Sequence, residues 1–303
     1  MNIPKNLKKG DTIGIIAPSG DLREYTINEI KLGIESYGYK VKIGKSCYLT
    51  YRGYLAGNDE IRASDLENMF LDTDIDAIMC LRGGYGTSRI LNLINYDIIK
   101  NNPKVFIGFS DITALHIAFN KKCDLVTYHG IMANTVNKWD DFSYKSLIEC
   151  INFKDELILK NPCKDSIKSL YKGKASGDII GGNLSMIACS LGTEYEIDTR
   201  GKILFIEEVG EYIYRVDRLL NHLSLAKKFD DCNGIIFGDF NDCRKSTKQD
   251  CDLIDLLVEI ANRYKKPTLY NIKSGHCKPM VTIPFGIKCK IDADECSIIF
   301  NKK

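Results

Sequence analysis

The segment that decides the fold is Lys104-Val-Phe-Ile-Gly-Phe-Ser-Asp-Ile-Thr-Ala-Leu-His116. An apolar run typical of a buried strand, 105–109, meets Ser110, and a helix-compatible run, 111–119, follows at once. A hydroxyl at the tip of a tight strand-to-helix turn is the pattern of a nucleophile elbow, and the N–H groups that open the helix would favour an oxyanion. Ser and Asp are also preferred helix N-caps, so the segment taken alone fits an ordinary capped helix at least as well.

On both sides of this segment, short apolar runs and amphipathic runs alternate through the first half of the chain. This alternation, with glycine-bearing turns between the runs, predicts βαβ units and a mostly parallel sheet. We therefore expect an N-terminal α/β domain over residues 1–155 that carries Ser110. The expected strands are 12–17, 41–43, 76–81, 105–109 and 125–128, and the expected helices are 24–37, 60–71, 87–93 and 111–119.

The pattern weakens in a charged, lysine-rich stretch, and we expect a linker over residues 156–178. A second domain, 179–303, is then predicted to be mixed, with more strand and antiparallel pairing. Its expected helices are 184–191, 214–228 and 251–264, and its expected strands are 202–207, 234–238, 268–270 and a group between 280 and 300.

Bulk composition narrows the class of protein. The chain has 303 residues, 42 basic and 40 acidic side chains and a formal net charge of +2. No basic stripe or polybasic helix is present, so neither nucleic acid nor a membrane is an expected partner. The apolar run 12–17 is shorter than a secretory signal core, and the expected location is cytoplasmic. The twelve cysteines contain no CxxC pair, which favours reduced thiols, and we expect neither a metal nor another cofactor.

A serine nucleophile needs a base to accept its proton. Of the four histidines, His116 lies too far along its helix, and His222 falls in a leucine-rich amphipathic helix as a surface or packing residue. His129 ends a predicted strand and is a plausible pocket residue. His276 lies in a loop after a short strand, where catalytic groups are often displayed, and we favour it over His129.

A carboxylate is needed to orient that base. The segment Ile203-Leu-Phe-Ile-Glu-Glu-Val-Gly-Glu211 runs from an apolar strand into acids, and Glu207 closes the strand. The alternative is that these acids form a solvated acidic loop. The order Ser, Glu, His along the chain is a known triad order. The turn Arg82-Gly-Gly-Tyr-Gly86 could complete an oxyanion hole, or it could hold a phosphate, although it lacks the spacing of nucleotide-binding loops.

These residues resemble a known family, the L,D-carboxypeptidases of serine peptidase type. It includes murein tetrapeptide carboxypeptidases and microcin C self-immunity proteins. The resemblance implies a flavodoxin-like or amidotransferase-like α/β domain and a smaller β-rich α+β swivelling domain. It implies Ser110 as nucleophile, Glu207 as orienting acid and His276 as base, with the N–H groups of Asp111 and Gly84 as oxyanion donors. The motifs that carry it, in order, are Pro18-Ser-Gly20, Arg82-Gly-Gly-Tyr-Gly86, Gly108-Phe-Ser-Asp-Ile-Thr113, Gly181-Gly-Asn-Leu184, the segment Glu207 to Arg218, Gly275-His276 and Pro284-Phe-Gly286.

The expected activity is a carboxypeptidase that releases the terminal D-alanine of a murein tetrapeptide, a small peptide substrate. Arg82, Arg215 and His129 are candidate substrate-binding residues, since a guanidinium can grip a carboxylate. The resemblance also implies a homodimer. One alternative is a microcin C-type hydrolase of a peptidyl- or aminoacyl-nucleotide, disfavoured because the only tryptophan, Trp139, lies outside the triad loops. Another is a non-catalytic Rossmann-like protein that binds a small molecule.

Overall fold

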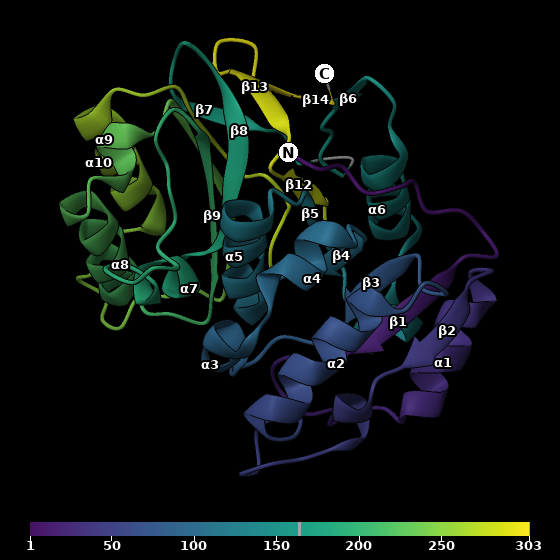
Figure 1. Ribbon diagram of the computed structural model, residues 1–303. Coiled ribbons are helices and arrows are strands. Elements are labelled where there is room, and N and C mark those ends of the chain that lie inside the picture. Colours follow the sequence, from purple (N-terminus) through teal and green to yellow (C-terminus); the bar gives the residue numbers. More distant parts are fainter. Residues whose placement is uncertain (163–164, 303) are drawn as a thin grey trace. The chain divides into compact units, whose positions relative to one another are not determined.

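The chain forms two compact units in the computed structural model, which describes residues 1–162 and 165–302 (Figure 1). Unit 1 comprises Met1–Asn152 and Thr282–Pro284, and unit 2 comprises Phe153–Val281 and Phe285–Lys303. Each unit is built on its own β-sheet, so the expectation of two domains with an α/β architecture is confirmed. Within the described ranges, no helix has both the length and the apolar character needed to cross a membrane.

Unit 1 contains a six-stranded sheet in the order β12-β5-β4-β3-β1-β2. The pairs from β2 across to β5 are all parallel, as the alternating pattern predicts. The last strand of the order, β12, comes from near the end of the chain, a long-range pairing that the sequence pattern does not reveal. The strands are β1 (Thr12–Ile16), β2 (Lys40–Ile43), β3 (Ala77–Cys80), β4 (Val105–Gly108), β5 (Thr127–His129) and β12 (Ile283–Phe285).

The helices of unit 1 follow from capping and apolar spacing. In α2, the Asn58 side chain accepts a hydrogen bond from the Ile61 backbone at 2.9 Å, and this N-cap starts the helix. Phe70 of α2, Phe106 of β4 and Phe119 of α5 meet in a buried aromatic cluster with ring centroids 4.9 to 6.3 Å apart. The helices are α1 (Ile27–Ser36), α2 (Asp59–Leu71), α3 (Thr87–Ile90), α4 (Tyr96–Asn101), α5 (Thr113–Cys123) and α6 (Asp141–Asn152), with 3-10 turns η1 (Lys45–Tyr48), η2 (Leu91–Leu93), η3 (Ser110–Ile112) and η4 (Ala133–Lys138).

Unit 2 contains an eight-stranded mixed sheet in the order β6-β14-β13-β8-β9-β10-β11-β7. The four strands from β8 to β11 are parallel, and β13, β14, β6 and β7 pair antiparallel at the two sides. The strands are β6 (Glu156–Ile158), β7 (Lys168–Tyr171), β8 (Lys174–Asn183), β9 (Ile203–Val209), β10 (Gly234–Asn241), β11 (Thr268–Tyr270), β13 (Lys288–Asp292) and β14 (Ser297–Asn301), and the helices are α7 (Leu184–Cys189), α8 (Ile213–Leu225), α9 (Lys228–Asp231) and α10 (Leu253–Tyr264).

The segment expected as a linker, 156–178, instead carries strands of unit 2. It contributes β6, β7 and the first half of β8 to the sheet. The lysines in these strands, Lys168 and Lys174, are exposed, and pairing partners lie far along the chain, as in the pairing of Glu156 with Asn301. Local sequence therefore gave too weak a strand signal there.

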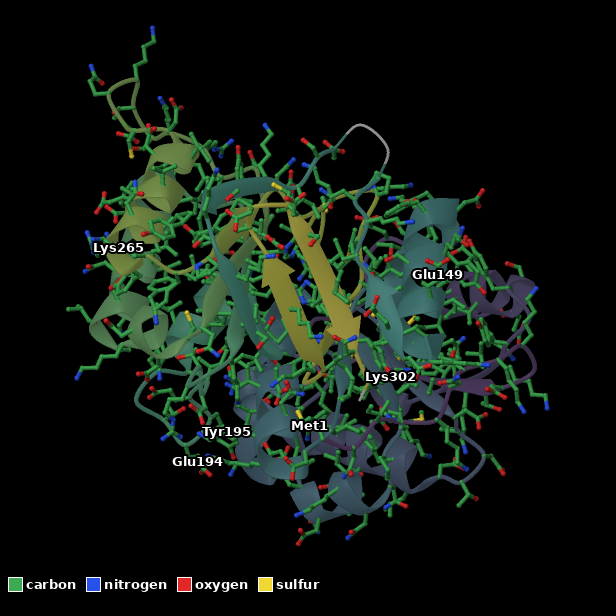
Figure 2. All side chains as sticks on the ribbon, turned by 90° about the horizontal axis from the view of Figure 1, so that it is seen from above. Met1, Glu149, Glu194, Tyr195, Lys265 and Lys302 are labelled. Atoms are coloured by element: carbon green, nitrogen blue, oxygen red, sulfur yellow. The ribbon has the colours of Figure 1, made fainter. Side chains whose placement is uncertain are left out.

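Charged side chains of both signs are spread over the surface (Figure 2), and the described cysteines form no disulfide. Nitrogen-tipped and oxygen-tipped side chains are mixed over the molecule (Figure 2). The eleven cysteines in the described ranges are free thiols, and several of them, such as Cys80 and Cys289, are buried. The twelfth, Cys163, lies outside the described residues.

The close approach of β8 and β9 gives a stability prediction. A Cβ at Gly181 would lie 1.8 Å from the Phe205 carbonyl oxygen, and Gly181 has φ +142°. Gly181→Ala should therefore lower the free energy of unfolding by about 3 kcal/mol or more, measured by urea denaturation. Gly192→Ala is the matched control, because Gly192 also has positive φ but meets nothing within 4 Å. It should cost only about 1 kcal/mol. Equal losses in the two variants would show that the predicted clash is relieved.

Candidate active site

Ser110 lies at the tip of the turn between β4 and α5. Its φ of +66° places it in the left-handed region, which non-glycine residues seldom occupy. At Gly108 a side chain would meet Ile112 at 2.8 Å, so the turn is tight enough to require glycine there. Strand, strained serine and helix follow one another as a nucleophile elbow requires.

Asp111 does not cap the helix, contrary to the simpler interpretation of this segment. Its carboxylate accepts hydrogen bonds from the Ser19 hydroxyl at 2.6 Å and the Thr87 backbone N–H at 2.8 Å. Only 2% of the residue is exposed. Burial raises the pKa of Asp111, although these hydrogen bonds and the charge of Arg62 act in the opposite direction.

The glycine-rich loop that follows β3 lies directly beside the serine. A Cβ on Gly83 would be 2.8 Å from the Ser110 Cβ, 3.0 Å from its Oγ and 3.4 Å from the Asp111 nitrogen. The Gly83 carbonyl accepts a hydrogen bond from the Gly20 N–H at 3.3 Å. Because the peptide is trans, the N–H of Gly84 points away from Gly20. Gly83 is a residue of the candidate site that sequence reasoning missed, since a run of glycines does not reveal which member faces Ser110.

The substrate-binding candidates are placed as follows. Arg82 is half-buried and donates to the Asp21 carbonyl at 3.0 Å. Arg215 is exposed on α8, where it pairs with Glu211 at 3.4 Å. His129, at the end of β5, is fully buried, with its ring 5.8 Å from that of Phe109. A role in binding substrate stays a prediction for all three.

Glu207 and His276 form a hydrogen-bonded pair in unit 2. The Nδ1 of His276 lies 2.8 Å from Oε2 of Glu207, whose side chain is fully buried near the end of β9. Gly275, with φ +129°, makes the approach possible, because a Cβ there would lie 2.6 Å from the same Oε2. Burial raises the pKa of Glu207, and the hydrogen bond to His276 opposes that rise. When Nδ1–H donates to the carboxylate, the neutral ring carries its lone pair on Nε2, as a general base requires.

The neighbouring acid has a different environment. Glu208 is also buried, but its carboxylate accepts hydrogen bonds from the Asn183 amide at 2.8 Å and the Ser185 hydroxyl at 2.6 Å. Glu208 thereby fixes the start of α7. The alternative of a solvated acidic loop is wrong for Glu207 and Glu208, because the strand carries both into the interior on opposite faces.

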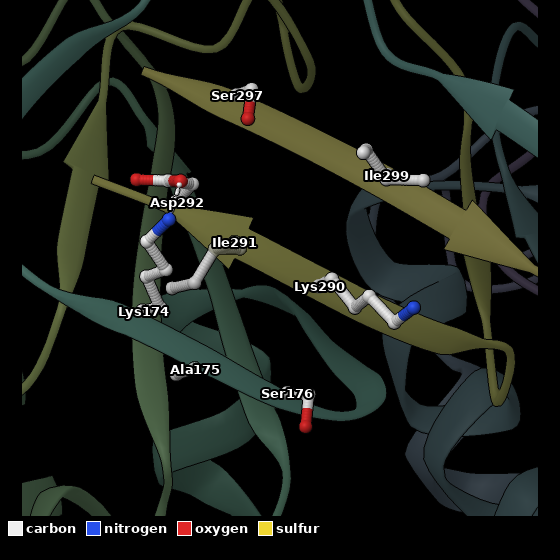
Figure 3. A pocket seen from close by; sticks show the side chains of 8 residues that line it. All are labelled: Lys174, Ala175, Ser176, Lys290, Ile291, Asp292, Ser297 and Ile299. Carbon is white, nitrogen blue, oxygen red and sulfur yellow. Dashed lines mark ion pairs between the residues drawn. The ribbon is translucent and has the colours of Figure 1, made fainter. Parts of the chain in front are cut away.

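A separate pocket lies on the face of β8, β13 and β14 in unit 2 (Figure 3). Lys174 and Asp292 form an ion pair of 2.8 Å within it, and Lys290 lines it further along β13. None of the candidate catalytic residues lines this pocket. In the described ranges, no group of three or more His, Cys, Asp or Glu side chains is placed to hold a metal ion.

Serine hydrolases use a serine hydroxyl, an imidazole and a carboxylate, and the chain contains a left-handed serine in unit 1 and a buried carboxylate–imidazole pair in unit 2. Residues 13–130 match the LD-carboxypeptidase N-terminal domain, and residues 176–291 match the LD-carboxypeptidase C-terminal domain. The chain therefore belongs to the LD-carboxypeptidase family of peptidases.

Proteins that are similar along nearly the whole chain support this family assignment. A probable murein peptide carboxypeptidase of Bacillus subtilis is 39% identical over an alignment 305 residues long, gaps included, that covers 96% of this chain and 92% of that protein. The crystal structure of muramoyltetrapeptide carboxypeptidase from Oxalobacter formigenes is 27% identical with a TM-score of 0.83, covering 95% of this chain and 97% of that one. The microcin C7 self-immunity protein in complex with aspartyl sulfamoyl adenosine is 28% identical with a TM-score of 0.92, covering 100% and 99%.

A buried histidine beside the Ser110 turn gives a pH-dependence prediction. The Nε2 of His116 lies 2.8 Å from the Gly108 carbonyl, and burial lowers the pKa of His116 from 6.5 to about 4. Between pH 6.5 and pH 4, the imidazole of the unfolded chain binds a proton and that of the folded chain does not. The neutral His116 therefore contributes to the free energy of unfolding above pH 6.5, and this contribution is lost as the pH falls toward 4. Between about pH 7 and pH 4, wild type should lose about 3 kcal/mol more than His116→Gln in urea unfolding.

The exposed His222 on α8 supplies the control substitution for this comparison. His222→Gln should follow the pH profile of the wild type. If His116→Gln follows it as well, His116 does not titrate between these two pH values.

Proposed function

We propose that the protein is a serine L,D-carboxypeptidase that removes the terminal D-alanine from murein tetrapeptides. Ser110 is the nucleophile, His276 is the general base and Glu207 orients His276. The observation that carries the proposal is the 2.8 Å contact between Nδ1 of His276 and the buried Oε2 of Glu207, in a chain that belongs to a carboxypeptidase family. The left-handed Ser110 supports it independently.

In this mechanism the Ser110 Oγ attacks the carbonyl of the L-configured residue that precedes D-alanine. His276 takes the hydroxyl proton on Nε2, and the Glu207 carboxylate stabilises the resulting imidazolium. The N–H groups of Asp111 and Gly84 hold the oxyanion. His276 then gives its proton to the leaving amine of D-alanine, and a water molecule hydrolyses the acyl-serine by the reverse proton path.

The triad is tested by release of D-alanine from a synthetic murein tetrapeptide, followed by mass spectrometry. Ser110→Ala should lower kcat by about 10⁴- to 10⁶-fold, and Glu207→Gln by about 10³- to 10⁴-fold, because the imidazole loses its orienting charge. Glu259→Gln, an exposed change on α10, is the matched control and should retain full activity. Turnover by Ser110→Ala at the wild-type rate would eliminate the serine mechanism.

Recognition of the substrate carboxylate is assigned to Arg82. It belongs to the loop beside Ser110, whereas the Arg215 guanidinium is already paired with Glu211. Arg82→Gln should raise KM about tenfold or more with a smaller change in kcat, since uniform binding is removed. Arg215→Gln should change KM less than about twofold. The opposite ranking of the two variants would reassign the role to Arg215.

A second candidate substrate is an aminoacyl-nucleotide. It is favoured by the likeness to the microcin C7 self-immunity protein and by two exposed tyrosines, Tyr54 and Tyr85, whose rings lie 6.0 Å apart. Tyr85 is part of the glycine-rich loop. Trp139 is not available for a base, because it packs against Tyr37 and Tyr144. Assaying the tetrapeptide and an aspartyl sulfamoyl adenosine side by side separates the two substrates.

Three further expectations remain predictions. A cytoplasmic location and a homodimer follow from the sequence and its resemblance, and cell fractionation and light scattering test them. A non-catalytic binding role predicts that no serine is labelled by a fluorophosphonate probe. Labelling of Ser110 would contradict that role.

A further inference from the structure

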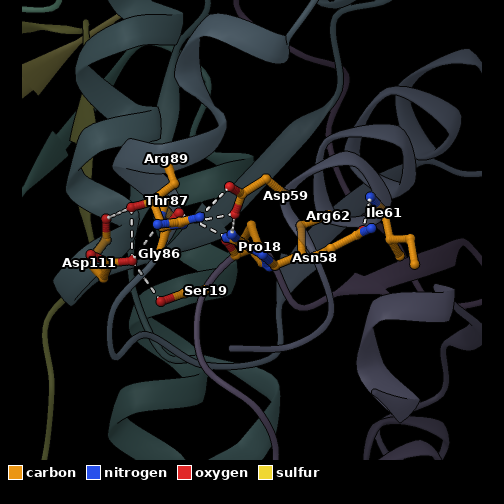
Figure 4. A network of polar contacts seen from close by, with 10 residues as sticks. All are labelled: Pro18, Ser19, Asn58, Asp59, Ile61, Arg62, Gly86, Thr87, Arg89 and Asp111. Carbon is orange, nitrogen blue, oxygen red and sulfur yellow. Dashed lines mark hydrogen bonds and ion pairs between the residues drawn. The ribbon is translucent and has the colours of Figure 1, made fainter. Parts of the chain in front are cut away.

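Three loops of unit 1 are joined through one carboxylate (Figure 4). Ser19 belongs to the loop after β1, Thr87 follows the glycine-rich loop after β3, and Asp111 directly follows the nucleophile after β4. Asp111 Oδ2 lies within 2.6 Å of the Ser19 hydroxyl, 2.8 Å of the Thr87 N–H and 2.9 Å of the Thr87 hydroxyl. That hydroxyl also contacts the Asp111 carbonyl, so its one proton is shared between two acceptors on the same residue.

A buried arginine supports these loops from α2. Arg62 is fully buried, and its Nη1 donates to the carbonyl of Pro18 at 2.6 Å and to that of Gly86 at 2.8 Å (Figure 4). Its Nη2 pairs with Asp59, which Arg89 holds in bidentate fashion at 2.6 and 2.9 Å. One guanidinium therefore fixes the backbones of two of the three loops, and the Asp59 carboxylate, which Arg62 shares with Arg89, offsets part of its charge.

The three loops meet beside Ser110, whose backbone conformation is strained. Ser110 is held at φ +66°, a conformation that persists only when its surroundings over-determine it. Gly83 faces Ser110 so closely that a small rotation of its loop would close or open the space beside Oγ and the Asp111 N–H. Ser19 and Thr87 have 0% exposure and Asp111 has 2%. These side chains have no surface to offer a substrate, so any effect on the reaction must pass through the backbone that they hold.

We propose that Ser19, Thr87 and the Asp111 carboxylate, supported by Arg62, are positioning residues that set the glycine-rich loop against the Ser110 turn and so build the oxyanion hole. This set of residues is named the Asp111 clamp. The inference rests on the proposed serine mechanism, and it assigns the clamp a role in turnover rather than in substrate binding.

The sharpest test is Thr87→Val, which removes the hydroxyl but keeps the volume and the backbone N–H bond to Asp111. It should lower both kcat and the second-order rate of Ser110 labelling by a fluorophosphonate by about 10- to 100-fold, because donors misplaced by a fraction of an ångström stabilise the oxyanion poorly. KM should stay within about threefold of wild type. Thr87→Ser, which restores a hydroxyl, should recover most of the rate.

The control is the same substitution in unit 2. Thr268 is fully buried, and its hydroxyl donates to the Lys266 carbonyl at 2.8 Å. Thr268→Val therefore loses a comparable hydrogen bond, and it should keep the wild-type kcat and labelling rate. Ser19→Ala is the second clamp variant, and it decides the question if Thr87→Val does not fold.

The outcomes separate the clamp from the proposed function. If wild type neither cleaves the tetrapeptide nor reacts with the probe at Ser110, the serine mechanism fails. If wild type does both, and Thr87→Val and Ser19→Ala react at the wild-type rate, the clamp is overturned and the mechanism stands. Equal loss of rate in Thr87→Ser and Thr87→Val would also overturn it, because the hydroxyl would not be the group that matters.

Discussion

The left-handed backbone of Ser110 is the constraint on which the N-terminal site depends. Such a conformation costs about 1 to 3 kcal/mol for a non-glycine residue and must be offset by its surroundings. The surrounding residues offset this cost in two ways, through the absence of side chains and through hydrogen bonds. Gly83 and Gly108 remove side chains that would collide with the turn, and Asp111 gives the turn hydrogen bonds to two other loops. Gly108 and Asp111 of the Gly-Phe-Ser-Asp motif are therefore both needed to hold Ser110 in its left-handed conformation.

A similar combination of contacts holds the Glu207–His276 pair in unit 2. A carboxylate with no exposure carries a large desolvation penalty, and a hydrogen bond to an imidazole offsets part of it. The partner must come very close, and only glycine at position 275 leaves room for it. Here too a missing Cβ and a buried polar contact occur together. Gly83 and Asp111 constrain Ser110 within unit 1, and Glu207 holds His276 within unit 2.

Much of the fold and of the candidate site was predictable from local sequence patterns, and the elements that were missed have physical explanations. The strand-to-helix turn at Ser110 and the buried strand that ends near Glu207 were visible because apolar runs stop abruptly at polar residues. Strands β6 and β7 were missed because their pairing partners lie far away in the chain, and burial on one face leaves lysines such as Lys168 exposed. Gly83 could not be distinguished from Gly84 in a run of glycines. The burial of Arg62 on α2 has no local signal in the sequence, because its partners, the carbonyls of Pro18 and Gly86, come from other loops.

Arg62 shows why burial alone does not explain the architecture of the turn. Replacing a buried ion pair by well-packed apolar side chains is often neutral or stabilising, so stability gives no reason for a guanidinium at this position. An apolar residue of similar volume would leave the Pro18 and Gly86 carbonyls without this donor and Asp59 without one of its two arginines. The guanidinium fixes the distance between the two loops, because Nη1 donates to both carbonyls at once while Nη2, in the same rigid plane, holds Asp59. A fixed distance is what an oxyanion hole built from backbone N–H groups requires, since those donors cannot adjust by changing rotamer.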